Sequence, residues 1–255
     1  MFKTLRILIL LAILVVVGAG TWLARVRTTA WDLPLRVAIF PINADASSAT
    51  DRYIRSLTVD AFEPIAAFMR QEGARYGLAL STPVEVFLAP EIGRVPPLPP
   101  FGGNALRVAL WSLQMRYWAW ANAAYDGPKP HVRVFVLYHD PDRVTRLSHS
   151  LGLQKGLIGV VNAFAFEKQA AQNDVVIAHE LLHTLGATDK YDPRTNQPEF
   201  PDGYADPQRQ PLLPQEYAEI MAGRVPFTAD RAEMPDGLDA VLIGAKTGRE
   251  INWVR

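Results

Sequence analysis

Residues 173–189 read Asn-Asp-Val-Val-Ile-Ala-His-Glu-Leu-Leu-His-Thr-Leu-Gly-Ala-Thr-Asp, an apolar stretch interrupted by two histidines and a glutamate. We expect a helix from about Asn173 to Leu185, with Asn173 as its N-cap. Gly186 is expected to end this helix, because glycine readily takes the left-handed conformation of a helix C-terminus. Apolar residues lie on most sides of the helix, so we expect it to be buried.

The histidines and the glutamate have the spacing of a catalytic metal site. His179 and His183 are four residues apart, so both imidazoles lie on one face of the helix and can bind a single ion. Glu180 can reach water on that ion without binding the metal itself. A catalytic zinc ion has three protein ligands and one open position. After Gly186 the chain can turn back, so that Asp189 supplies the third ligand.

The pattern His-Glu-x-x-His-x-x-Gly-x-x-Asp at residues 179–189 resembles that of the metzincin zinc peptidases, in the variant found in snapalysin-like enzymes. The resemblance implies a Zn²⁺ cofactor bound by His179, His183 and Asp189, with Glu180 as the general base. It also implies a metzincin-like fold and hydrolysis of peptide bonds.

Two further features of metzincins have candidates in this chain. The resemblance implies a methionine turn below the metal, for which Met221 is suitably placed. It also implies an antiparallel edge strand before the active-site helix, where residues 156–164 stand. Some metzincins have a tyrosine two residues after the methionine, but Gly223 occupies that position here. Tyr191 or Tyr204 could take the place of that tyrosine, and their positions in the sequence do not decide between them.

Alternatives stay open for the third ligand and for the function. Gluzincin-type peptidases take a glutamate from a downstream helix, which makes Glu216 and Glu219 the rivals of Asp189. We predict a zinc metalloendopeptidase with a peptide or protein substrate. The alternative is a zinc-stabilised binding or scaffold protein with weak or no activity. Glu180 favours the enzyme, because a structural site has no use for that carboxylate. Surface or structural roles are the default for the other histidines, which are His131, His139 and His149.

Composition excludes several classes of protein. The chain has 255 residues, of which 49% are apolar and 20% charged, as in an ordinary globular protein with a sizeable core. Its 26 basic and 26 acidic residues give a net charge of zero, so nothing indicates nucleic acid as a partner. There are no cysteines, so histidines and carboxylates must hold any metal.

Residues 7–24 form an uncharged, apolar run at the N-terminus. As a helix the run would span about 27 Å, close to the thickness of a bilayer core. We expect residues 1–27 to be a single-pass transmembrane anchor, with the catalytic domain of residues 28–255 on the outer, periplasmic or extracellular side. The alternative is a cleaved secretory signal and a secreted protein.

The remaining segments predict an α/β (α+β) sandwich. Its mixed, twisted sheet is covered by the active-site helix and followed by a small, irregular C-terminal subdomain from residue 187 to residue 236. Pro64 is expected to kink or break its helix, and the aromatic-rich helix at 104–125 is expected to be a core helix. The strand at 131–138 alternates, which indicates half-burial. Strands are expected at 35–42, 84–88, 131–138 and 156–166, and further helices at 51–76, 104–125 and 237–245.

Overall fold

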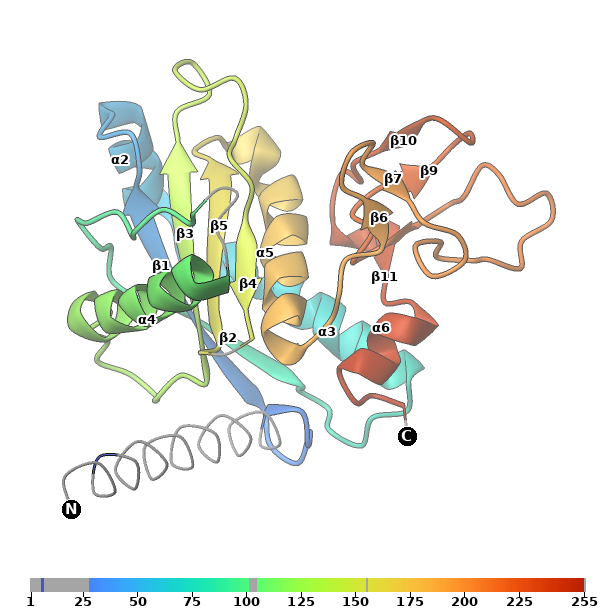
Figure 1. Cartoon of the computed structure of the whole chain (residues 1–255), viewed down its shortest axis with the longest axis horizontal. Coiled ribbons are helices and arrows are strands. Elements are labelled where there is room, and N and C mark those ends of the chain that lie inside the picture. Colours follow the sequence, from blue (N-terminus) through green and yellow to red (C-terminus); the bar gives the residue numbers. More distant parts are fainter. Residues whose placement is uncertain (1–5, 7–27, 101–104, 155, 255) are drawn as a thin grey trace.

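The computed structural model describes residue 6 and residues 28–100, 105–154 and 156–254, and its centre is a five-stranded sheet (Figure 1). Four strands are parallel, and one edge strand is antiparallel to its neighbour. The mixed sheet with its helices confirms the expected mixed α/β class. In spatial order the strands are β2 (Val84–Leu88), β1 (Leu35–Asn43), β3 (Val132–His139), β5 (Ile158–Phe164) and β4 (Leu151–Leu153).

The antiparallel edge strand differs from the one expected at residues 156–164. That segment forms β5, which lies inside the sheet and runs parallel to β3. The edge position belongs to β4, which pairs with β5 through a turn in which the N–H groups of Gly156 and Leu157 donate to the Gln154 carbonyl. Because β4 has only three residues, it is too short to show an alternating pattern in the sequence.

Alternate residues of the strands form two separate cores, one on each face of the sheet. Ile39 and Val134 belong to the core that also contains residues of α3 and α5, whereas Phe40 and Phe135 pack with residues of α4. Helices therefore cover both faces of β3, and this strand is buried on both sides. The expected half-burial at residues 131–138 is wrong, because it assumes a sheet with one face in solvent.

The helix expected at residues 51–76 is two helices, α2 (Ser48–Ser56) and α3 (Glu63–Arg75). A 3₁₀ turn at Val59–Phe62 separates them. Pro64 lies in the first turn of α3, where its missing N–H costs no helical hydrogen bond. The expected break is therefore present, and the proline begins the second of the two helices.

Helix α4 (Ala105–Asn122) lies on the second face of the sheet, and one of its sides is buried there. Trp111, Met115 and Ala119 are the residues of this buried side. The expectation of a core helix is wrong for the opposite side, where five large apolar side chains are 58% to 78% exposed. These side chains belong to Leu106, Leu110, Leu113, Tyr117 and Trp120.

Helix α5 (Ala170–Leu185) carries the histidine motif and begins earlier than expected, after a 3₁₀ turn at Glu167–Gln169. Asn173 is not its N-cap but lies within the helix. Its side-chain amide donates to the Phe164 carbonyl at 3.0 Å and accepts from the Phe164 N–H at 3.3 Å, which ties α5 to the end of β5. Gly186 ends the helix as expected, with a φ of 109°.

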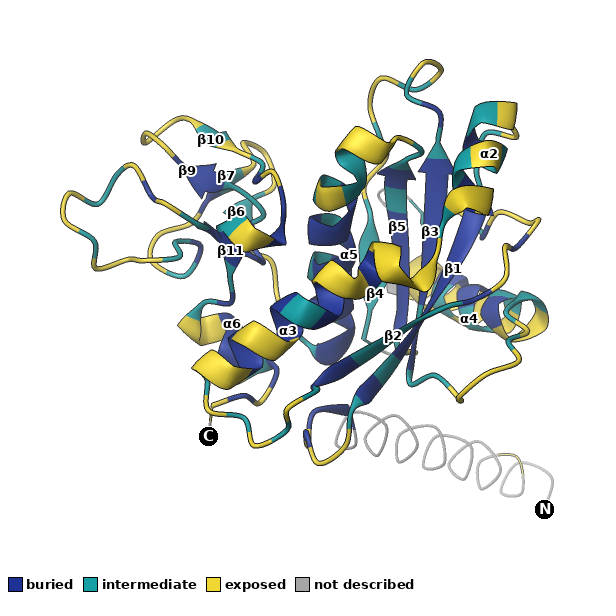
Figure 2. Cartoon of the chain, turned by 180° about the vertical axis from the view of Figure 1, so that it is seen from behind, coloured by how far each residue is buried: buried dark blue, intermediate teal, exposed yellow. Residues whose placement is uncertain are grey.

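The chain after α5 is irregular, as expected, and lies on the side of α5 away from the sheet (Figure 1). Most of α5 is therefore buried (Figure 2). The helix expected at residues 237–245 is wrong, because a 3₁₀ turn at Leu238–Ala240 leads into a strand that pairs with β8. The short elements of this part are β6 (Tyr191–Asp192), β7 (Gln197–Pro198), β8 (Ala218–Glu219), β9 (Val225–Pro226), β10 (Ala232–Glu233), β11 (Val241–Leu242) and α6 (Ala245–Glu250).

The helices of the described residues do not support the expected membrane anchor. None of those helices combines the length and the apolar character that a bilayer crossing requires. The single-pass topology with an outward-facing catalytic domain is therefore withdrawn. Residues 7–24, on which that expectation rested, lie outside the described residues.

Candidate metal centre

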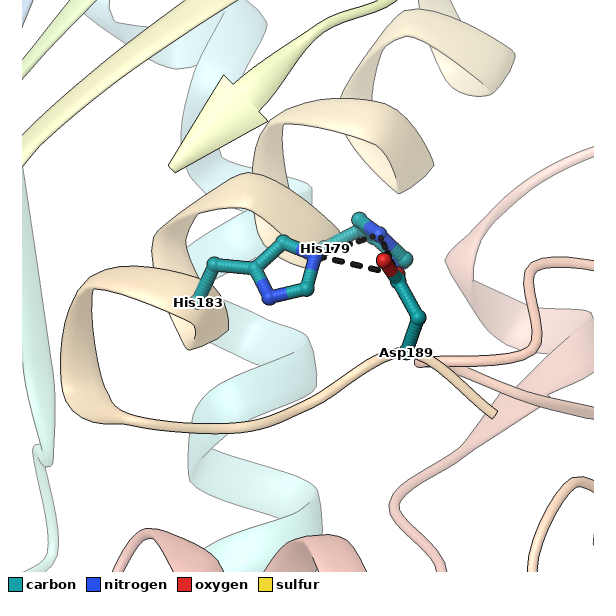
Figure 3. A group of neighbouring side chains, drawn as sticks. All are labelled: His179, His183 and Asp189. Carbon is teal, nitrogen blue, oxygen red and sulfur yellow. Dashed lines mark hydrogen bonds and ion pairs between the residues drawn. The ribbon is translucent and has the colours of Figure 1, made fainter. Parts of the chain in front are cut away.

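Two histidines of α5 and one aspartate of the following loop converge on one point (Figure 3). The Nε2 atoms of His179 and His183 lie 3.0 Å apart. Asp189 Oδ1 lies 3.2 Å from the first of these nitrogens and 3.1 Å from the second. In a tetrahedral site with bonds of about 2.0–2.1 Å, neighbouring ligand atoms are about 3.3–3.4 Å apart. The three atoms therefore have nearly the spacing of ligands to a single ion.

The other ring nitrogen of each histidine determines what its Nε2 can do. His179 Nδ1 lies 2.9 Å from the Ile220 carbonyl, and His183 Nδ1 lies 2.8 Å from the Ala187 carbonyl. A carbonyl oxygen only accepts, so each Nδ1 carries the proton and each neutral ring directs its Nε2 lone pair toward Asp189. Three acceptors then face one another, and a single proton can serve only two of them. A metal ion satisfies all three, and backbone carbonyls commonly orient metal-binding histidines in this way.

Gly186 brings Asp189 back to the helix that carries the histidines. Its positive φ ends α5, and the Ala187 N–H donates to the Leu182 carbonyl at 3.1 Å across the end of the helix. This turn places the Ala187 carbonyl against His183 and lets Asp189 reach both imidazoles. Residues with a Cβ rarely adopt such a φ, so the glycine is required by the path of the chain.

Glu180 lies near the three candidate ligands His179, His183 and Asp189, which we call the metal group, but does not belong to that group. Its side chain is buried, and its Oε2 atom has no hydrogen-bond partner in the described part of the chain. Glu180 and His179 line a cavity of about 270 Å³. The carboxylate is therefore positioned to accept a proton from a molecule bound in this cavity. Other residues of the cavity wall include His149, Asn162, Val175, Val176, Tyr191, Ala222, Gly223 and Arg224.

Burial and neighbouring charges change the acidity of these groups. Burial raises the pKa of Glu180, although the charges of His179 and His183 partly oppose the shift. Burial also raises the pKa of Asp189, but its contacts with the two histidines outweigh it and hold that pKa far below its usual value. Burial lowers the pKa of His179, yet its contact with Asp189 and the Glu180 charge bring it above the ordinary value. Asp189 is therefore a carboxylate, as a ligand must be.

A buried turn at residues 219–223 supports His179 from below. The N–H groups of Ala222 and Gly223 donate to the Glu219 carbonyl, so the chain reverses sharply at Met221. Met221 is fully buried in the core that also contains α5 residues. The turn presents the Ile220 carbonyl to the imidazole. It thus lies where the methionine turn was expected.

The rival third ligands do not join the metal group. Among the described residues, His179, His183 and Asp189 form the one group of three or more such side chains close enough to share an ion. Glu216 is exposed and pairs with Arg209 at 3.5 Å. The buried Glu219 carboxylate accepts from backbone N–H groups and a hydroxyl.

The remaining histidines and tyrosines separate into cavity residues and structural residues. His149 and Tyr191 line the cavity. For His149 only a surface or structural role was expected. Burial and the charges of Asp189 and Glu180 raise the pKa of Tyr191. Tyr204 packs against Phe200 instead. His131 accepts from the Arg36 N–H at 3.0 Å, and His139 contacts Asn162, so both have local structural contacts.

Sequence reasoning missed the carbonyls of Ile220 and Ala187, because every residue has a backbone carbonyl and the side chain does not show which one will bind a histidine. The sequence indicated only the turn that contains Ile220, because Met221 was the candidate for a methionine turn. No protein-family model matches this chain, and no curated protein matches it either. The chemistry of the site therefore has to be inferred from its own geometry.

Proposed function

We propose that this chain is a zinc-dependent endopeptidase in which water attacks a peptide carbonyl and Glu180 acts as general base. One observation carries the proposal. Three acceptor atoms of His179, His183 and Asp189 converge with no proton to satisfy them all, and the carboxylate of Glu180, whose buried Oε2 is unpaired, is near enough to interact electrostatically with these residues. A site built only for stability would have no use for that unpaired carboxylate.

The donor set supports zinc as the metal. Two imidazoles and one carboxylate are a usual ligand set of catalytic zinc, whereas calcium and magnesium prefer oxygen ligands alone. The chain has no cysteine, so thiolate chemistry does not compete. A bound Zn²⁺ would lower the pKa of a water ligand toward 7 and polarise a substrate carbonyl.

Glu180 moves the proton in the proposed reaction. Its unpaired Oε2 takes a proton from the attacking water and later returns it to the leaving amine. Burial raises the pKa of this carboxyl group, which makes it a better base than an exposed glutamate. Asp189 and the two imidazoles stay in place through both proton transfers.

The substrate is proposed to be an extended peptide held beside β4. This strand is an antiparallel edge of the sheet next to α5, and edge strands bind peptides through main-chain hydrogen bonds. It lies so close to α5 that a Cβ on Gly152 would be 2.4 Å from the His183 Cβ. The nearby cavity is large enough for one substrate side chain.

We extend the proposal to kinship with the metzincins. The motif at residues 179–189, the buried turn at Met221 and the antiparallel edge strand β4 support it. Gly223 in place of the tyrosine of some members leaves oxyanion assistance to another group, and Tyr191 is the tyrosine that lines the cavity.

A peptide-library assay on the purified chain tests the proposed function, with zinc content measured on the same sample. We expect cleavage that a chelator stops and added zinc restores. Zinc binding without any cleavage would support the scaffold protein instead. A chain with neither zinc nor cleavage would refute both.

A further inference from the structure

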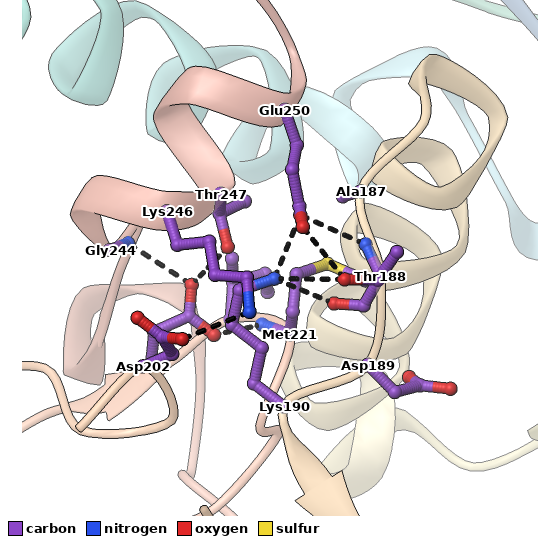
Figure 4. A network of polar contacts seen from close by, with 12 residues as sticks. Ala187, Thr188, Asp189, Lys190, Asp202, Met221, Gly244, Lys246, Thr247 and Glu250 are labelled. Carbon is purple, nitrogen blue, oxygen red and sulfur yellow. Dashed lines mark hydrogen bonds and ion pairs between the residues drawn. The ribbon is translucent and has the colours of Figure 1, made fainter. Parts of the chain in front are cut away.

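The loop that carries Asp189 is connected on both sides to the C-terminal helix α6 (Figure 4). Thr188 donates from its backbone N–H to Glu250 Oε2 at 3.0 Å and from its hydroxyl to Glu250 Oε1 at 2.7 Å. Lys190 donates from Nζ to the same Oε2 atom at 2.8 Å. One carboxylate thus binds both neighbours of the candidate third ligand.

Lys190 is buried, and it is held by its backbone as well as by its side chain. Its side chain is 2% exposed, and Nζ also donates to the Thr188 carbonyl at 2.8 Å. Its N–H donates to the Met221 carbonyl at 3.0 Å, and its carbonyl accepts from the Glu199 N–H at 2.8 Å. A buried ammonium group needs a paired negative charge, which Glu250 supplies.

Asp189 itself has little other support. Its side chain is 46% exposed, and its polar contacts within the described part of the chain are those with the two histidines. Packing therefore does not fix its carboxylate. The residues on either side must do so, and Glu250 binds the backbone N–H of Thr188 and the side-chain ammonium group of Lys190.

We infer that Glu250 is a positioning residue of the metal centre: by holding Thr188 and Lys190, it keeps Asp189 in place as the third ligand. The inference rests on the proposed function only in taking this centre to bind zinc. Glu250 belongs neither to the metal group nor to the residues that line the cavity, so it acts through its neighbours.

Glu250→Gln tests the inference, because the variant keeps the size of the side chain but removes the charge that Lys190 needs. The zinc Kd is measured by chelator competition, and apo-protein stability by urea unfolding. We expect the zinc Kd to rise about 10- to 100-fold, as for other groups that orient metal ligands. The absorption spectrum of the Co²⁺-loaded protein should also change, because the coordination of the ion changes.

Asp202→Asn is the matched control. Asp202 forms an ion pair with Lys246 of the same helix at 2.9 Å, and both side chains are more than 40% exposed. Losing this pair should leave the zinc Kd within about twofold, since exposed ion pairs contribute little. Thr188→Val is the second variant if Glu250→Gln does not fold. It removes the hydroxyl bond to Glu250 together with the longer contact from Lys190 Nζ, and it should raise the zinc Kd several-fold.

The outcomes separate this inference from the proposed function. An unchanged zinc Kd in folded Glu250→Gln or Thr188→Val, with zinc lost in His183→Ala, would overturn the inference and leave the metal site intact. Lower apo-protein stability with an unchanged zinc Kd would overturn it too, since Glu250 would then be structural only. A wild-type chain without zinc would overturn the inference and the proposed function together.

Discussion

Helices α4 and α5 lie on opposite faces of one sheet, and both are rich in apolar residues. Helix α5 has the sheet on one side and the irregular C-terminal part on the other, so Leu181 and Leu182 are fully buried (Figures 1 and 2). Helix α4 is buried on its sheet side, whereas Leu113 and Trp120 on its other side are 58% and 78% exposed. Apolar composition alone thus does not determine burial. A second covering layer does.

The difference also has a chemical consequence. The second layer over α5 supplies the Ile220 carbonyl that orients His179. Glu180 of the same helix is buried, and burial raises the pKa of its carboxyl group. On α4, Arg107 and Gln114 are exposed and have no comparable enclosure. The candidate site therefore depends on a helix covered from both sides, and substitutions in the two helices should differ accordingly.

The largest difference concerns metal binding. His183→Ala on α5 should abolish zinc binding, because it removes one of the three proposed ligands, whereas Gln114→Ala on α4 should not change it. Elemental analysis after dialysis should find about one zinc per wild-type chain and none in His183→Ala. Equal zinc content in the wild type and His183→Ala would rule out the site.

Catalysis should show the next largest effect. Glu180→Gln should keep zinc and lose turnover by about 10²-fold or more, because the amide cannot accept the proton from water. Glu216→Gln changes an exposed glutamate outside the metal group, so it should alter neither property. Peptide cleavage and zinc content are measured for both variants. Near-normal turnover in Glu180→Gln would remove the general base from the mechanism.

Matched leucine truncations test the burial difference itself. Leu182→Ala on α5 should lower the free energy of unfolding by about 2–5 kcal/mol, because it leaves a cavity in the core. Leu113→Ala on α4 should change it by no more than about 0.5 kcal/mol, as is usual for exposed positions. Urea unfolding of the zinc-free proteins measures both values. Similar losses in the two variants would show that another layer covers α4 in solution.

A pH effect on α5 should be the smallest of the four. Burial raises the pKa of Asp174 to about 7 in the folded protein, from 3.8. The folded state therefore binds a proton more tightly than the unfolded state, and its stability falls as the pH rises from about 4 to about 7. Asp174→Asn should remove this loss and stabilise the protein by on the order of 2 kcal/mol at pH 8, with little effect at pH 4. Urea unfolding at both pH values checks this, and an equal effect at each would contradict the assigned pKa.

Much of the candidate site could be predicted from residues close together in the chain. The spacing of His179 and His183 places both imidazoles on one face of α5, and Gly186 indicates the turn that returns Asp189 to them. Strands β1 and β2 were predicted for a similar reason, because a local pattern of apolar residues identifies them. Asn173 shows the limit of such patterns. A residue typical of a helix N-cap instead bonds to Phe164 of a neighbouring strand.

What depends on distant segments could not be predicted in this way. The Ile220 carbonyl lies 41 residues from His179, and Glu250 lies 60 residues from Lys190. The layer that buries α5 but not α4 is likewise formed by residues remote in the chain. Motif spacing and strongly patterned strands follow from interactions over a few residues, so the sequence indicates them directly. Burial, hydrogen-bond partners and pKa values follow from which segments fold against one another, and that depends on the packing of the whole chain.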